Sequence, residues 1–92
     1  GLAYGLAPGL TWITDAGRTV LVDGLGGRSW TLHGLEAAVW DLMALGYSYE
    51  GIAGTLALLA GTDDEQGHTL LSATVRRWQD MGLLCAAEAN RP

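Results

Sequence analysis

The first third of the chain alternates apolar and polar residues over short segments, and glycine-containing turns separate these segments. A period of two places successive side chains on opposite faces of a β-strand. Residues 15–17 (Asp-Ala-Gly) are typical of a hairpin turn, and residues 24–27 (Gly-Leu-Gly-Gly) form a second break. The pattern therefore predicts a three-stranded antiparallel meander over residues 10–14, 18–23 and 28–32.

Beyond residue 34, apolar residues recur every three or four positions, which is the period of a helix that buries one face. Ser48 is a suitable N-cap for the second predicted helix, because its hydroxyl can accept from a free backbone N–H. Thr62 opens a Thr-x-x-Glu capping box before the third helix. The predicted helices cover residues 35–45, 48–59 and 62–81, followed by a short extended tail at 83–85. This order of elements predicts an α+β fold.

The length and composition of the chain favour one small domain without a deep cleft. Hydrophobic residues make up 49% of the 92 residues and charged residues 16%, which is enough apolar material for a core. A domain of this size buries only about two thirds of its unfolded surface. We expect the domain to span residues 10–85, with an N-terminal extension at 1–9 and a C-terminal tail at 86–92.

Charge and cysteine content narrow the set of partners. Five arginines against ten acidic residues give a net charge of −5, which disfavours nucleic acid and anionic lipid. The single cysteine, Cys85, cannot form an internal disulfide, and no apolar run approaches the roughly 20 residues of a membrane span. The N-terminal string GLAYGLAPGL lacks the basic flank of a signal peptide. These features predict a cytoplasmic protein with no membrane or nucleic-acid partner.

The last predicted strand is the best candidate for a binding surface. A sheet of three strands leaves an unpaired edge, and an unpaired edge can accept a peptide as a further strand. In this strand Trp30 and Leu32 share one face, while Ser29 and Thr31 share the other. We therefore expect the outer edge of residues 28–32 to be the docking edge.

Three strings of the sequence resemble the PqqD-like family of winged-helix recognition elements for ribosomally made peptides. They are WTLHGLEAAVWDL, GYSYEGIAGTL and VRRWQDMGLL, and the resemblance covers about residues 8–84. The aromatic residue and leucine of the third strand, the aliphatic-Trp pair of the first helix and the Gly-Leu-Leu after the third helix match the family pattern. His33 departs from it, because asparagine is usual at that position.

The resemblance implies a winged helix-turn-helix-like fold and a non-catalytic function. Members of the family bind the leader segment of a precursor peptide as an added strand, in a groove between the third strand and the third helix. In this chain the implied ladder is Arg28, Ser29, Trp30, Thr31 and Leu32, and the implied groove wall is Leu71, Thr74, Val75 and Trp78.

A more specific resemblance is to the free-standing leader-binding proteins of lasso-peptide pathways. It is carried by the aspartate that ends the second strand, the glycine turn after it and the aromatic third strand. It implies a separate leader peptidase or another peptide-modifying enzyme as the working partner, and we expect a monomer without a cofactor. The domain then acts by tethering its substrate.

Simpler interpretations of the same residues remain open. Trp30, Trp40 and Trp78 are the kind of large aromatic residues that fill the core of a small domain. Arg28 is suited to binding a leader carboxylate, and it is equally suited to protecting an edge strand from aggregation. Arg76 lies outside the apolar arc of its helix and is expected in solvent.

Metal binding and catalysis are not predicted. His33 and His68 have no cysteine or acidic residue at metal-ligand spacing. Cys85 and His68 could be paired as nucleophile and base, but the sequence offers no third orienting group and no oxyanion turn beside them.

Two other binding functions compete with leader recognition. One is a winged-helix DNA-binding regulator, which the acidic start of the third helix at residues 63–65 disfavours. The other is an adaptor that binds a folded protein. Binding of a short peptide would separate this adaptor from a leader-binding domain.

Overall fold

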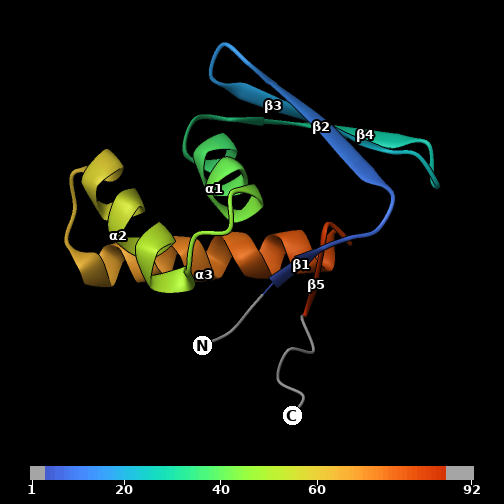
Figure 1. Ribbon diagram of the computed structural model, residues 1–92. Helices are drawn as coiled ribbons and strands as arrows, with labels where there is room; N and C mark the ends of the chain where they lie inside the picture. Colours follow the sequence, from blue (N-terminus) through green and yellow to red (C-terminus); the bar gives the residue numbers. More distant parts are fainter. Residues whose placement is uncertain (1–3, 87–92) are drawn as a thin grey trace.

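The computed structural model describes residues 4–86, in which the first of three helices lies between a small antiparallel sheet and the other two helices (Figure 1). The elements are β1 (Tyr4–Leu6), β2 (Leu10–Asp15), β3 (Arg18–Asp23), β4 (Arg28–His33), α1 (Gly34–Ala44), α2 (Tyr49–Ala60), α3 (Asp64–Asp80) and β5 (Leu84–Ala86). Strands β2, β3 and β4 form the predicted meander, and three helices follow it. The α+β prediction is therefore confirmed.

The register of the meander separates an inner face from an outer face. Trp12, Leu21 and Trp30 are opposite one another on adjacent strands. Leu21 is completely buried and the two tryptophans are partly buried, so this row faces the helices. On the other face Ile13 is 73% exposed, as expected for a three-stranded sheet with helices on one side only.

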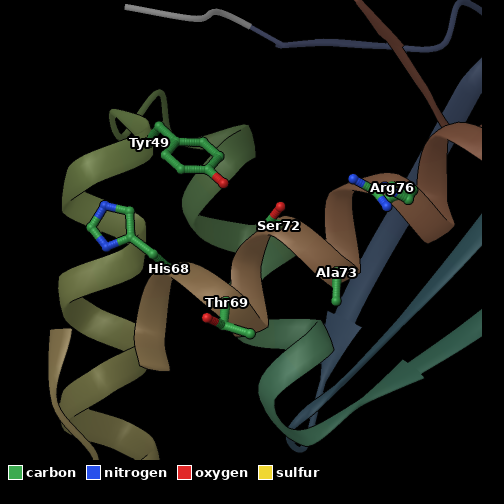
Figure 2. A pocket seen from close by; sticks show the side chains of 6 residues that line it. All are labelled: Tyr49, His68, Thr69, Ser72, Ala73 and Arg76. Atoms are coloured by element: carbon green, nitrogen blue, oxygen red, sulfur yellow. The ribbon is translucent and has the colours of Figure 1, made fainter. Parts of the chain in front are cut away.

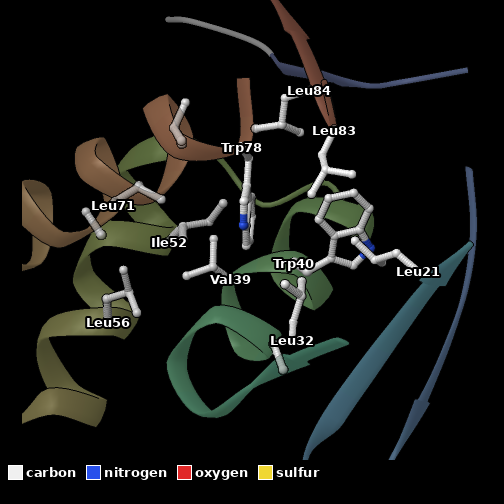
Figure 3. Packing of buried hydrophobic residues seen from close by; sticks show 13 residues of the cluster. Leu21, Leu32, Val39, Trp40, Ile52, Leu56, Leu71, Trp78, Leu83 and Leu84 are labelled. Atoms are coloured by element: carbon white, nitrogen blue, oxygen red, sulfur yellow. The ribbon is translucent and has the colours of Figure 1, made fainter. Parts of the chain in front are cut away.

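The core is built around two tryptophans from different helices. The ring of Trp40 in α1 lies between Trp12 and Trp78, with centroids 5.5 Å and 5.3 Å away, and both contacts are edge to face. Trp40 and Trp78 are completely buried, and Leu83 packs beside them (Figure 3). Edge-to-face aromatic pairs contribute about 0.5–1.5 kcal/mol beyond the area they bury. This cluster joins the sheet to α1 and α3.

Part of the predicted N-terminal extension belongs to the fold. Strand β1 pairs antiparallel with β5, with Gly5 opposite Cys85 and Leu6 opposite Leu84. The N–H of Ala7 also donates to the carbonyl oxygen of Leu83 at 3.0 Å. A segment of three residues is too short to show the alternation from which strands are predicted. The partner strand also lies at the other end of the chain.

The helix termini follow the sequence with one correction. The Ser48 hydroxyl accepts from the N–H of Gly51 at 3.0 Å, which confirms the predicted cap of α2. The N-cap of α3 is Asp63, because its carboxylate accepts from the N–H of Gln66 at 2.9 Å. The prediction of Thr62 as the capping residue was wrong by one position. None of the helices within residues 4–86 has the length and apolar character required to cross a bilayer.

Close packing of α2 against α3 depends on a single glycine. A Cβ atom at Gly67 would collide with the carbonyl oxygen of Ala53 and lie 3.1 Å from the Cβ of Ala57. Both alanines are buried in α2. The absence of a side chain at Gly67 therefore sets the distance between the two helices.

Candidate functional site

Strand β4 presents the edge that the sequence predicts. It pairs with β3 on one side, and no strand in the described part of the chain pairs with its other side. Strand β2 is the second edge of the sheet. The two edges differ, because the Thr14 hydroxyl of β2 donates to the carboxylate of Asp41 in α1 at 2.9 Å. A side chain thus ties β2 to a helix.

The predicted ladder residues occupy consecutive positions of β4 with alternating environments. Ser29 and Thr31 are exposed on the outer face. Leu32 is buried in the core, and Trp30 is half-buried on the same face. The guanidinium carbon of Arg28 lies 4.9 Å from the centre of the Trp30 ring, at the exposed end of the strand. Backbone and side chains together give this edge a polar face and an apolar face.

The predicted groove wall lies in the core and not on the surface. Leu71 and Trp78 are completely buried, Val75 is 6% exposed, and Thr74 is 9% exposed. The Thr74 hydroxyl donates to the backbone oxygen of Leu70 at 2.9 Å. Helical periodicity identifies the apolar face of α3, but the domain's own strands and helices cover that face. A peptide cannot contact Leu71 or Trp78 unless core side chains move.

The surface near the end of β4 contains other residues that sequence reasoning missed. Arg77 of α3 forms an ion pair with Glu36, which is in the first turn of α1 directly after β4. Leu70 and Ala73 lie on the same stripe of α3 as Arg77, because they precede it by seven and four positions. Leu70 is 37% exposed and Leu35 is 39% exposed. No local pattern could have revealed this surface, since it joins α1 to α3.

A surface depression lies over α3 and the start of α2, and Ala73 belongs both to its lining and to the surface near the end of β4. Its volume is about 480 Å³, and it is open to solvent. Figure 2 shows Ser72 and Arg76 on one side of α3 together with Tyr49, and Thr69 and Ala73 on the other side. The hydroxyl groups of Tyr49, Thr69 and Ser72 line this depression together with apolar surface.

His68 joins α2 to α3 at the edge of this depression. Its Nδ1 lies 3.0 Å from the backbone oxygen of Asp64, and its Nε2 lies 2.8 Å from a carboxylate oxygen of Glu50. Both neighbours are acceptors, so the ring satisfies both only as the imidazolium. Two hydrogen bonds raise the pKa of His68 above its ordinary value. The bond to the backbone oxygen of Asp64 has the larger effect, and the bond to the Glu50 carboxylate has the next largest.

Within residues 4–86, no group of three or more His, Cys, Asp and Glu side chains could hold a metal ion. His33 is exposed at the end of β4, and His68 is occupied by Asp64 and Glu50. The side chain of Cys85, the nucleophile candidate beside His68, lies outside the described residues.

Comparison with solved structures shows which fold this arrangement belongs to. The chain is similar to TbiB1 in complex with the TbiA(beta) leader peptide, with a TM-score of 0.80 and 18% identity over 87% of this chain and 93% of that chain. It is also similar to lasso peptide synthetase B1 complexed with the leader peptide, with a TM-score of 0.79 and 21% identity over 89% of this chain and 96% of that chain. No family model and no curated protein matches the sequence.

At these identities the likeness concerns the fold. The chain has the winged helix-turn-helix-like α+β fold of two proteins whose structures contain leader peptides. This fold is the one that the resemblance noted in the sequence implies, and that expectation is confirmed.

Proposed function

We propose that this chain is a non-catalytic recognition domain that binds the leader segment of a ribosomally made precursor peptide of the lasso class. The peptide adds as a strand to the free edge of β4. The edge of β4, which no other strand within residues 4–86 covers, in a fold shared with two leader-bound proteins, is the observation that supports this proposal. The acidic first turn of α3 disfavours the alternative of a DNA-binding regulator.

Side chains must contribute to binding as well as the backbone. A ladder along β4 adds about four or five hydrogen bonds, each contributing about 0.5–1.5 kcal/mol net. Ordering a free peptide costs a comparable amount, so the ladder alone gives weak affinity. The exposed parts of Trp30, Leu35 and Leu70 provide the apolar contacts in this proposal. Leu71, Thr74, Val75 and Trp78 support this surface from the core.

The domain acts in this proposal as a cytoplasmic monomer that delivers its peptide to a processing enzyme, such as a leader peptidase. Tethering raises the local concentration of the substrate at that enzyme. The second candidate function is that of an adaptor that binds a folded protein. It differs from leader recognition because a short peptide would not suffice for binding.

A titration followed by fluorescence anisotropy tests the proposal. The labelled probe is the leader peptide from the precursor gene encoded beside this one, with a scrambled leader and a DNA duplex as controls. We expect saturable binding of the leader alone. Salt-sensitive binding of the duplex would instead identify a DNA regulator, and failure of the leader to bind would overturn the proposal.

Strand addition has its own test in the backbone of the peptide. N-methyl groups placed at single positions along the leader remove one N–H donor each. Alternate N–H groups of an edge strand face its partner, so methylation should weaken binding at every second position. In the protein, amide hydrogen exchange should slow in β4 upon binding and stay unchanged in β2. Protection of β2 instead would place the peptide at the wrong edge.

A further inference from the structure

Arg28 is an exposed cation held on the binding face of β4. Its guanidinium carbon lies 4.9 Å from the centre of the Trp30 ring, and the two side chains are two residues apart on the same face of the strand. Stacking on an aromatic ring orients the plane of a guanidinium, while its N–H groups still point outward from the rim. Arg28 is therefore preoriented at the open edge.

The acidic residue opposite Arg28 in the register forms no ion pair with it. Asp23 is opposite Arg28 on β3, but its carboxylate accepts from the N–H of Leu25 at 3.0 Å in the turn between the strands. The ion pairs found among the described residues are His68 with Glu50 and Arg77 with Glu36, so Arg28 belongs to neither. This contrast separates Arg28 from Arg77, whose charge is already compensated.

Strand addition determines which peptide side chain lies opposite Arg28. A peptide strand beside β4 places one of its residues directly opposite Arg28, with Cβ atoms about 4.5–5.5 Å apart and both side chains on the same face. The peptide residue two positions away is opposite Trp30, on that same face. This correspondence holds for a parallel or an antiparallel peptide, since both have a side-chain period of two.

We propose that Arg28 and Trp30 select a leader in which an acidic residue and an apolar or aromatic residue lie two positions apart, in either order. The inference rests on the proposed function, and it names the chemistry that this edge reads. A carboxylate opposite Arg28 receives charge-assisted hydrogen bonds from the rim of the guanidinium. Because the whole chain carries a net charge of −5, this local cation provides the specific attraction for an acidic leader.

The test combines peptide and protein variants in one titration. Each acidic residue of the leader is changed singly to its amide, and each peptide is titrated against the wild type, Arg28→Gln and Arg76→Gln. We expect one acidic position whose change weakens binding about three- to tenfold, and a similar loss for Arg28→Gln with the unchanged leader. The two changes together should cost no more than either alone.

Arg76→Gln is the matched control, because it removes an exposed arginine on the side of α3 that faces away from Ala73 (Figure 2). It should leave every affinity within about twofold. A charge exchange tests the same pair in the opposite direction. Arg28→Glu should weaken leader binding, and a leader with lysine at the coupled position should restore it. Circular dichroism of each variant verifies that the domain is folded.

The outcomes separate this inference from the proposed function. If the leader binds and no acidic position couples to Arg28, leader recognition stands and the selection of an acidic residue is overturned. Arg28 then serves to protect the edge strand from aggregation. If the leader binds neither the wild type nor any variant, the proposed function itself fails.

Discussion

The rings of Trp40 and Trp78 meet edge to face with their centroids 5.3 Å apart, and both indole N–H groups are buried without an acceptor. Trp78 therefore belongs to the core, although the sequence also allowed it a place in the peptide groove. Replacing Trp78 by alanine should lower the free energy of unfolding by about 3–5 kcal/mol in urea titrations. Trp78→Phe should cost less, because it keeps an aromatic ring and removes an unsatisfied donor. Equal costs for the two variants would contradict this assignment.

The exposed and buried faces of α3 should respond differently to polar substitution. Leu70→Ser changes a side chain that is 37% exposed, so it should weaken leader binding while the melting temperature changes little. Val75→Asp places a charge at a buried position and should unfold the domain. Anisotropy titration and thermal unfolding of both variants distinguish the two effects. If Val75→Asp folded normally and only its leader binding were weakened, the groove wall would instead consist of the residues predicted from the sequence.

Two glycine-to-alanine substitutions should have opposite signs. Alanine at Gly67 gains helix propensity of about 1 kcal/mol, but its Cβ would collide with the backbone of Ala53, so the variant should be destabilised by at least about 1–3 kcal/mol overall. At Gly54 in α2 a Cβ meets no neighbouring atom within 4 Å. Gly54→Ala should therefore stabilise the domain by about 0.5–1 kcal/mol. Chemical unfolding of the two variants tests the close approach of α2 and α3, and a neutral Gly67→Ala would refute it.

The stability of the domain should depend on pH through His68. Its pKa is raised in the folded state by the hydrogen bonds to Asp64 and Glu50. Its contribution is therefore fully present below the unfolded pKa, about 6.5, and is lost as the pH rises through the higher folded pKa. The melting temperature of the wild type, measured relative to His68→Gln, should fall across this window. Glu50→Gln should reduce the dependence, and NMR titration of the imidazole should locate the folded pKa above 6.5.

Removal of residues 1–6 tests whether β1 belongs to the domain. Strand β1 pairs with β5 through Gly5 and Leu6, and Leu6 packs against the core. The deletion should lower the free energy of unfolding by about 1–3 kcal/mol, because apolar contacts and strand hydrogen bonds are lost. Unchanged unfolding would mean that the segment behaves as the extension expected from the sequence.

The local pattern of the sequence determined the order of the elements in the meander and the helices, as well as their approximate bounds. Alternation over a few residues and a period of three to four depend only on backbone geometry. The same is true of the Ser48 cap and the αL glycine at Gly61, which depend on a single turn of chain. The edge position of β4 followed from this order, and the structure confirms it.

The tertiary structure alone decided which side chains reach the surface. An apolar stripe on α3 is compatible with a core or with a groove, and only the contacts of Trp40 and Leu83 with Trp78 show that the domain covers it. The pairing of β1 with β5 and the Glu36–Arg77 ion pair likewise join segments far apart in the chain. Such contacts arise from the packing of whole elements, so no local period encodes them.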